Sequence, residues 1–212
     1  MLDYQKEFIK YALDCGVLKF GEFKLKSGRT SPYFFNTGLF NTGAQLSKLG
    51  VFYAQTLIQS KLQVDILYGP AYKGIPLASA ASIAYSQLKR DIPFAFNRKE
   101  AKDHGEGGLI VGAPLQGKVL ILDDVITAGT SVRESVEIIN NMNATPAGVL
   151  IALDRQEKGE NNKSAVQEVS ERFDMPVISI ISLTQIIEYL ELDGRSAEQL
   201  EIIKAYRLKY GI

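Results

Sequence analysis

The sequence predicts an α/β fold built on a doubly wound, mainly parallel sheet flanked by helices. Short apolar runs without polar alternation recur along the chain, which is typical of strands buried on both faces. Most of these runs are separated by segments with helical spacing of apolar residues. Because strands that alternate with helices form parallel sheets, these two observations together predict the fold class.

The N-terminal region contains two predicted helices with an irregular stretch between them. Residues 3–15 read as an amphipathic helix that ends at Gly16. Residues 20–38 break this pattern, because Gly, Ser and Pro stand among aromatic residues. Helical spacing resumes over residues 43–60. The single cysteine, Cys15, has no partner for an internal disulfide, and we expect it to pack in the core.

The predicted strands share continuous apolar character. They lie at residues 64–68, 92–96, 119–124, 148–153 and 176–181. Residues 182–209 read as helical and open with a capping box formed by Ser182 and Gln185.

Residues 112–119 nearly match the nucleotide-binding P-loop, but we reject this interpretation. The last position is Val119, which has no metal-binding hydroxyl, and the segment runs into a predicted strand. A P-loop must open a helix in order to aim its N–H groups at phosphate.

Composition excludes several classes of protein. With 212 residues, of which 46% are hydrophobic, the chain is long enough for one buried α/β domain and a small appendage. The formal net charge of zero lacks the basic surplus of nucleic-acid binders, so we expect no nucleic-acid partner. No apolar run approaches a membrane span, and the start lacks a signal-peptide pattern. We therefore expect a cytoplasmic protein with no membrane partner.

The strongest functional pattern covers residues 119–139. The predicted strand ends on Asp123 and Asp124, a loop of small and hydroxylated residues follows, and Ser131 with Glu134 forms a capping box for a helix. Phosphate suits the N-terminus of such a helix, and carboxylates accept hydrogen bonds from sugar hydroxyls or from the water shell of a metal. The pattern predicts a site for a ribose 5-phosphate. The alternative is an ordinary turn that one Asp caps.

Two other segments carry candidate phosphate-binding groups. Residues 69–74 form a glycine-flanked loop with Lys73 as a point charge, although a simple turn with a solvated lysine has the same pattern. Residues 96–108 gather Arg98, Lys99, Lys102 and His104 beside several glycines. Such a charge run is either a solvated surface or a mobile lid over a polyphosphate.

Residues 119–131 resemble the signature of the type I phosphoribosyltransferases, in which two acids and two apolar residues precede T-x-G-T/S. That family transfers ribose 5-phosphate from phosphoribosyl pyrophosphate to a nitrogen nucleophile. The resemblance implies a single phosphoribosyltransferase domain, with a small hood subdomain at about residues 1–40 and a core at about residues 41–212. It also implies a cis peptide bond at Ala71–Tyr72.

The resemblance assigns one group of residues to the ribose 5-phosphate. They are Asp123, Asp124, Val125, Ile126, Thr127, Ala128, Gly129, Thr130 and Ser131. A second group is implied to hold the pyrophosphate. It contains Tyr72, Lys73, Arg98, Lys99, Lys102 and His104. The residues expected to act in catalysis are Lys102, His104, Asp123 and Asp124.

Two further segments resemble one branch of this family, the orotate phosphoribosyltransferases. Residues 98–105 match a catalytic loop R-K-x-x-K-x-H-G, and residues 26–36 match an N-terminal motif that contains a phenylalanine pair. Orotate is a planar ring with a carboxylate, and a guanidinium can pair bidentately with such a group. The resemblance therefore assigns orotate binding to a third group. Its members are Lys26, Phe34, Phe35, Thr127 and Arg155.

The same resemblance implies partners and a cofactor. The small-molecule substrates are orotate and phosphoribosyl pyrophosphate, and Mg²⁺ is held mainly through substrate and water, with no direct protein ligand. A basic loop that reaches into the neighbouring active site implies a homodimer with shared sites. Two alternatives remain: a phosphoribosyltransferase for another base, such as a purine, and a regulator that senses phosphoribosyl pyrophosphate without turning it over.

Overall fold

The computed structural model describes residues 1–25, 28–102, 108–127, 129–159, 162–194 and 197–212. The strands are β1 (Leu18–Lys24), β2 (Thr30–Phe35), β3 (Ile66–Gly69), β4 (Phe94–Lys102), β5 (Gly108–Gly112), β6 (Lys118–Leu122), β7 (Thr145–Asp154) and β8 (Val177–Ser182). The helices are α1 (Asp3–Asp14), the 3₁₀ helix η1 (Thr37–Leu39), α2 (Gly43–Ser60), α3 (Gly74–Leu88), α4 (Thr130–Asn141), α5 (Ala165–Phe173), α6 (Leu183–Asp193) and α7 (Ala197–Tyr210).

The central sheet has six strands in the order β5-β4-β3-β6-β7-β8. Every neighbouring pair is parallel except β4 and β5, which are antiparallel. The predicted fold class is confirmed. The strand order reverses direction between β3 and β6, and this topological switch point is where open α/β sheets bind ligands, at the carboxyl ends of the strands.

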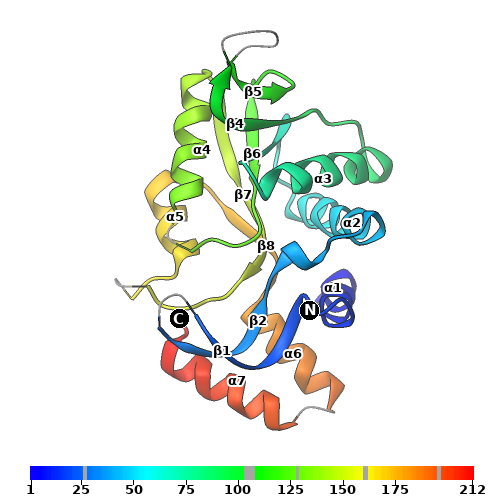
Figure 1. Cartoon of the computed structure of the whole chain (residues 1–212), viewed down its shortest axis with the longest axis vertical. Helices are drawn as coiled ribbons and strands as arrows, with labels where there is room; N and C mark the ends of the chain where they lie inside the picture. The colour runs from blue at the N-terminus through cyan, green and yellow to red at the C-terminus, as the bar shows by residue number, and fades with distance from the viewer. Residues whose placement is uncertain (26–27, 103–107, 128, 160–161, 195–196) are drawn as a thin grey trace.

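Both faces of the central sheet are buried, which explains the continuous apolar runs. Helices α1, α2 and α3 lie on one side of the sheet and α4 and α5 on the other (Figure 1). Along β6, Leu120 and Leu122 pack into the first layer, whereas Val119 and Ile121 pack into the second. Because side chains alternate across a strand, a strand covered on both faces needs apolar residues at every position.

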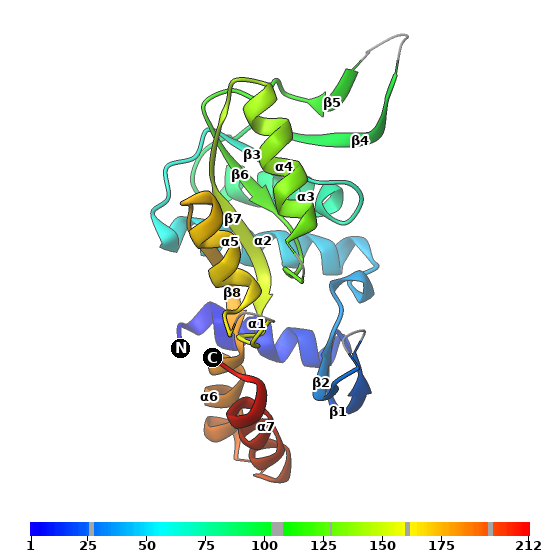
Figure 2. The same cartoon turned by 90° about the vertical axis from the view of Figure 1, so that its left-hand side faces the viewer.

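The irregular N-terminal stretch is an antiparallel hairpin of β1 and β2 that the sequence did not predict. A register shift between Phe20 and Phe23 interrupts the alternation that would have marked β1. Helix α7 packs against β2, and its residues Ile203 and Tyr206 are buried. Figure 2 shows the hairpin and α7 at the opposite end of the molecule from β4 and β5.

Two helix predictions have different outcomes. Helix α1 is present as expected, and Gly16 follows it in the left-handed region at φ +66°. The helical character expected over residues 182–209 is present, divided into two helices: Gly194, at φ +65°, ends α6, and α7 follows as a separate helix. The Ser182–Gln185 capping box is present at the start of α6. None of the helices in the described part of the chain is long and apolar enough to cross a membrane.

Candidate active site

Two loops flank the switch point of the sheet. One joins β3 to α3 through residues 70–73, and the other joins β6 to α4 through residues 123–129. Nζ of Lys73 lies 2.6 Å from Oδ2 of Asp124 and links the two loops. The side chain of Asp124 is only 9% exposed, whereas that of Lys73 is 59% exposed. The lysine therefore neutralises a buried carboxylate and keeps much of its own side chain in solvent.

The 70–73 loop is tightly folded and tied to β4. The peptide bond between Ala71 and Tyr72 is cis, as the resemblance implied. A side chain on Gly69 would lie 2.0 Å from the carbonyl oxygen of Gly74, so this turn requires a residue without Cβ. Oδ1 of Asn97 in β4 accepts hydrogen bonds from the backbone N–H of Ala71 and from the hydroxyl of Tyr68, both at 2.9 Å.

The carboxyl group of Asp123 is a weaker acid than an ordinary aspartate. Burial, the largest cause, and the neighbouring charge of Asp124 together raise the pKa of Asp123 to about 6, against hydrogen bonds from the Asp124 N–H and the Ser131 side chain that lower it. Oδ1 of Asp123 accepts that N–H at 2.9 Å, and its carbonyl oxygen accepts the hydroxyl of Tyr53 at 2.7 Å. Helix α2, which carries Tyr53, therefore helps to fix the backbone position of Asp123.

Asp124 is held from three directions. In addition to Lys73, Oδ2 of Asp124 accepts a hydrogen bond from the hydroxyl of Thr37 at 3.0 Å. Oδ1 accepts the backbone N–H of Val125 at 2.9 Å. Thr37 is buried and lies in η1, directly after the hairpin, so the N-terminal region positions one of the two acids.

The residues after the acids lead into α4. Val125 and Ile126 are half-buried and pack against the layers on opposite faces of the sheet, while Thr127 and Thr130 are exposed and Ser131 is half-buried. The predicted capping box of Ser131 and Glu134 is wrong: the helix begins at Thr130, and no side chain caps it. Gly129 precedes the helix at φ +68°, a conformation that costs glycine little. The first N–H groups of α4 therefore remain available to an anion.

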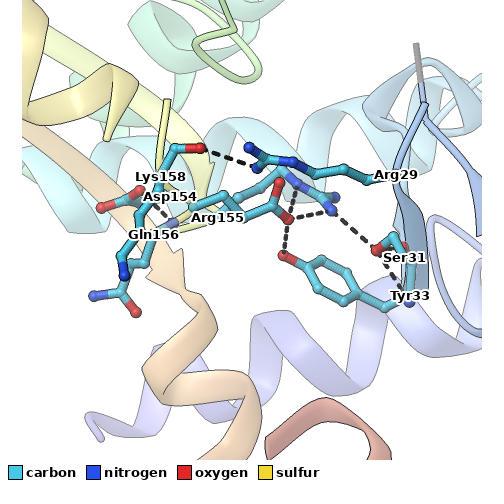
Figure 3. A network of polar contacts seen from close by, with 8 residues as sticks. Arg29, Ser31, Tyr33, Asp154, Arg155, Gln156 and Lys158 are labelled. Atoms are coloured by element: carbon cyan, nitrogen blue, oxygen red, sulfur yellow. Dashed lines mark hydrogen bonds and ion pairs between the residues drawn. The ribbon is translucent and has the colours of Figure 1, made fainter. Parts of the chain in front are cut away.

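Arg155 follows β7 on the same edge of the sheet, as predicted, but its guanidinium is already engaged (Figure 3). Nε and Nη2 both donate to Oε1 of Glu157, at 2.8 and 2.6 Å, and Nη2 also donates to the hydroxyl of Ser31 at 3.0 Å. The guanidinium carbon lies 4.3 Å from the centroid of the Tyr33 ring. Burial lowers the pKa of Arg155, but Tyr33 and Glu157 together raise it above its ordinary value.

The paired phenylalanines point in opposite directions, as adjacent residues of a strand do. The ring of Phe35 packs on Phe8, with centroids 6.4 Å apart, and the ring of Phe34 packs on Phe23 at 5.4 Å. The two side chains therefore belong to different faces of the hairpin. Their assignment to a pyrimidine pocket stays a prediction.

The basic segment is partly a strand. Residues up to Lys102 extend β4, and Nη1 of Arg98 donates to the carbonyl oxygen of Gly108 at 3.1 Å. Lys99 places its Nζ 5.6 Å from the ring centroid of Tyr72, which is 69% exposed. These three expected pyrophosphate residues thus lie along β4 and the adjacent loop. Lys26, His104, Ala128 and the side chain of Lys102 lie outside the described residues.

A cavity of about 490 Å³ lies elsewhere, between the hairpin and α7. None of the expected site residues lines it. In the part of the chain that the structure describes, no three His, Cys, Asp or Glu side chains gather in a way that could hold a metal ion.

Several residues of the site were not found from the sequence. They are Thr37, Tyr53, Asn97 and Glu157. Thr37, Tyr53 and Asn97 contact segments that are distant in the chain. Glu157 contacts Arg155 two residues before it, through a side-chain orientation that the sequence does not reveal. The motif spacing gave no signal for any of them.

Comparisons of the sequence and the fold with known proteins identify the family. Residues 42–181 match the family model described as phosphoribosyl transferase domain. The chain is 58% identical over 212 residues to an orotate phosphoribosyltransferase from Thiobacillus denitrificans and 59% identical over 213 residues to one from Pseudomonas putida, with full coverage of both chains in each case. A crystal structure of orotate phosphoribosyltransferase from Francisella tularensis has a TM-score of 0.89 and 47% identity, covering 97% of this chain and 100% of that one. The chain therefore belongs to the orotate phosphoribosyltransferases, within the type I phosphoribosyltransferase family.

Proposed function

We propose that this chain transfers ribose 5-phosphate from phosphoribosyl pyrophosphate to N1 of orotate, giving orotidine 5′-monophosphate and pyrophosphate in de novo pyrimidine (UMP) biosynthesis. The observation that carries the proposal is the ion pair of Lys73 and Asp124 across the switch point. It joins the loop assigned to pyrophosphate with the loop assigned to ribose phosphate. Arg155, after the strand next to β6, adds a cation for the carboxylate of orotate.

The ribose phosphate is bound by the 123–131 segment. Asp123 and Asp124 accept hydrogen bonds from the ribose hydroxyls, and Thr37 and Tyr53 keep both acids in place. The 5′-phosphate lies at the start of α4, where backbone N–H groups and the hydroxyls of residues 127–131 converge.

The pyrophosphate end is bound by cations. As the bond to ribose C1 breaks, C1 gains oxocarbenium character, the pyrophosphate gains charge, and orotate N1 attacks from the opposite face and releases its proton to the departing pyrophosphate or to water. Catalysis then rests on positioning and on stabilisation of the leaving group, without a protein nucleophile. The groups assigned to stabilise the charge on the pyrophosphate are Tyr72, Lys73, Arg98, Lys99, Lys102 and His104.

The orotate end of the site is assigned to the hairpin and to the loop after β7. Arg155 pairs with the carboxylate, together with the hydroxyl of Thr127, while Lys26, Phe34 and Phe35 contact the ring. The buried Ser31 contact and the Tyr33 ring support this role for Arg155, because they hold its guanidinium in one orientation. A preorganised guanidinium loses less entropy when a planar carboxylate binds.

Mg²⁺ belongs to the proposal as an ion that the substrate's pyrophosphate and water hold. Both oxygens of Asp124 already accept hydrogen bonds within the chain, which disfavours direct ligation by this residue. Asp123 lies beside it and can accept from a metal-bound water. When bound, Mg²⁺ neutralises charge on the pyrophosphate.

Three further parts of the proposal rest on the resemblance of the sequence motifs alone. The protein forms a homodimer in which the segment around Lys102 completes the neighbouring site. The N-terminal residues up to about 40 form a hood over the core. The location is cytoplasmic.

One assay tests the activity directly. Orotate absorbance is followed with phosphoribosyl pyrophosphate and Mg²⁺, and the expected result is loss of orotate with stoichiometric release of pyrophosphate. Turnover of a purine base in place of orotate identifies the other-base alternative. Tight binding of phosphoribosyl pyrophosphate without turnover of any base identifies the regulator. Either of these two results overturns the proposal.

A further inference from the structure

The pair formed by Arg155 and Glu157 has an uncommon geometry. A single oxygen of Glu157, Oε1, accepts from both Nε and Nη2 of Arg155. This Nε–Nη2 edge is one of the two edges of a guanidinium that can bind a carboxylate with two N–H donors. Glu157 therefore occupies an edge of Arg155 that a substrate carboxylate could otherwise use.

The guanidinium has little freedom to turn toward a second carboxylate. Its side chain is 20% exposed and that of Glu157 is 15% exposed, so water screens the pair only weakly. Ser31 holds Nη2 from the hairpin, and the guanidinium carbon lies over the ring of Tyr33 (Figure 3). A second carboxylate must share this fixed cation or displace the first.

The backbone around Glu157 is also held. The carbonyl oxygen of Gln156 accepts the N–H of Ile212 at 3.0 Å, and the N–H of Lys158 donates to the carbonyl oxygen of Tyr210 at 2.8 Å. Any displacement of the Glu157 carboxylate is therefore a rotation of its side chain, since the backbone on both sides is bonded to the end of α7.

Two phenol groups lie near Glu157. The hydroxyl of Tyr33 is 3.4 Å from the same Oε1. The hydroxyl of Tyr206 is buried without a hydrogen-bond partner in the described part of the chain. The ring of Tyr206 packs edge-on against that of Tyr33, with centroids 6.4 Å apart, and after burial the charge of Glu157 is the largest cause that raises the pKa of Tyr206. A rotated Glu157 side chain would have donors to accept from.

We propose that Glu157 is a competing carboxylate that holds Arg155 in the empty site and yields it to the carboxylate of orotate or of the orotidine nucleotide. The inference rests on the proposed role of Arg155. Glu157 acts as a positioning residue with an affinity cost: it keeps the guanidinium in place and weakens the binding of substrate and product. A weaker grip on the nucleotide favours its release.

The test compares two nucleotides that differ only by the carboxylate, orotidine and uridine 5′-monophosphate. Dissociation constants for both are measured by calorimetry on the full chain. The constant for the uridine nucleotide divided by that for the orotidine nucleotide isolates the carboxylate contribution, and a higher ratio means a stronger preference for the carboxylate. In Glu157→Gln, orotidine 5′-monophosphate is expected to bind roughly 10-fold more tightly, because like charges no longer share one guanidinium. The uridine nucleotide should bind as before. Glu171→Gln is the matched control, because Glu171 pairs with Lys163 on the exposed surface.

Failure of the inference is distinguishable from failure of the proposed function. If Arg155→Ala leaves the ratio of the two constants unchanged, Arg155 does not bind the carboxylate and the proposed assignment fails. If Arg155→Ala lowers the ratio but Glu157→Gln leaves it unchanged or lowers it, the competing role of Glu157 is overturned alone. Should Glu157→Gln lose the uridine nucleotide as well, Glu157→Asp, with a shorter side chain of the same charge, replaces it and should raise the ratio by a smaller factor.

A second variant addresses the destination of the carboxylate. Tyr206→Phe removes a donor for the rotated Glu157 side chain, so it should weaken the orotidine nucleotide in the wild-type background. In the Glu157→Gln background the same change should have no effect on the ratio. An equal effect in both backgrounds contradicts the rotation.

Discussion

The hydroxyl of Thr37 donates a hydrogen bond to Oδ2 of Asp124 at 3.0 Å, across 87 positions of the chain. Since Asp124 is buried, this contact from outside its own loop helps to fix the carboxylate. Thr37→Val should lower kcat/KM for phosphoribosyl pyrophosphate by about 10- to 100-fold, the scale of a lost hydrogen bond to a charged group. Thr37→Ser keeps the hydroxyl and should restore most of the loss. Equal defects in both variants would show that loss of the hydroxyl does not account for the effect.

The contact of Asn97 with the 70–73 loop leads to a second prediction. Asn97→Ala leaves the N–H of Ala71 and the hydroxyl of Tyr68 without their shared acceptor. We expect weaker binding of pyrophosphate, by roughly 1–3 kcal/mol, because buried polar groups lose their partner and the loop loosens. Calorimetric titration with pyrophosphate measures this. Tyr68→Phe removes only one of the two donors and should cost clearly less; a comparable cost would show that the bond to Ala71 is unimportant.

The pKa of Asp123, raised to about 6, predicts a pH-dependent affinity. The ionised carboxylate is the better acceptor for ribose hydroxyls, so the affinity for phosphoribosyl pyrophosphate should fall as the pH drops through about 6. The substrate's own phosphate also titrates near this pH. Asp123→Asn therefore serves as the control, and the difference between the two pH profiles reports Asp123. Superimposable profiles would exclude its ionisation from binding.

The same shift has a consequence for stability. The folded-state pKa is above the ordinary value of 3.8, so ionisation of Asp123 costs folding free energy. This contribution to stability is fully present below about pH 4 and is lost as the pH rises through about 6. Asp123→Asn should melt at a higher temperature than the wild type at pH 8, with the difference shrinking toward pH 4. A constant difference across this range would contradict the assignment.

The two ends of the substrate should respond differently to mutation. The pyrophosphate gains charge only as its bond breaks, so cations of residues 98–104 should act mainly on the transition state. Lys102→Ala should lower kcat by about 100- to 1000-fold with a smaller change in KM for phosphoribosyl pyrophosphate. Changing Thr130 and Ser131 to Val should mainly raise KM. Steady-state and single-turnover kinetics decide; retained turnover with weaker binding in Lys102→Ala would make the segment a binding flap.

Shared sites predict complementation between inactive chains. When Lys102→Ala and Asp124→Asn chains are mixed, hybrid dimers should regain activity, because one composite site recovers both intact groups. Subunit exchange is verified independently by mass spectrometry of the hybrid. If exchange is complete and activity is absent, each site is built within one chain.

The proposed contact of Arg155 with orotate can be tested by measuring the affinity for each substrate separately. Arg155→Ala should weaken orotate far more than phosphoribosyl pyrophosphate, by roughly 2–5 kcal/mol, the cost of losing one member of a buried charge pair. The loss includes the effect of leaving Glu157 without its cation. Equal weakening of both substrates would show that the carboxylate assignment is wrong.

The parallel core was predictable because its signal is local. A few consecutive residues are enough to indicate the apolar strands β6 and β7 and the loop of small residues after Asp124. Strand edges and caps were less predictable: β4 runs on through polar residues to Lys102 because antiparallel β5 pairs with it. The capping box at Ser131 failed because Gly129 supplies a left-handed entry that starts the helix at Thr130.

The positions of several candidate site residues were predictable from the sequence, but their contacts with one another were not. Asp123, Asp124, Lys73 and Arg155 were identified from motifs, and all of them lie on loops at the carboxyl edge of the sheet. The partners of Asp124 and Arg155 depend on tertiary packing. Sequence spacing could not show that a hydroxyl from η1 and a carboxylate two residues after Arg155 would take those positions.

Because the hairpin contacts Arg155, the part of the site assigned to orotate should form later during folding than the part assigned to ribose phosphate. Asp123 follows β6 directly and Ser131 lies in the first turn of α4, whereas the hydrogen bond that Arg155 donates to Ser31 spans 124 positions and the one that Arg29 donates to the carbonyl oxygen of Lys158 spans 129. Contacts of such long range must overcome the entropy of closing large loops and tend to form late. A refolding chain should therefore acquire its grip on ribose phosphate before it can distinguish one base from another, and pulsed hydrogen exchange should detect protection of α4 ahead of β2.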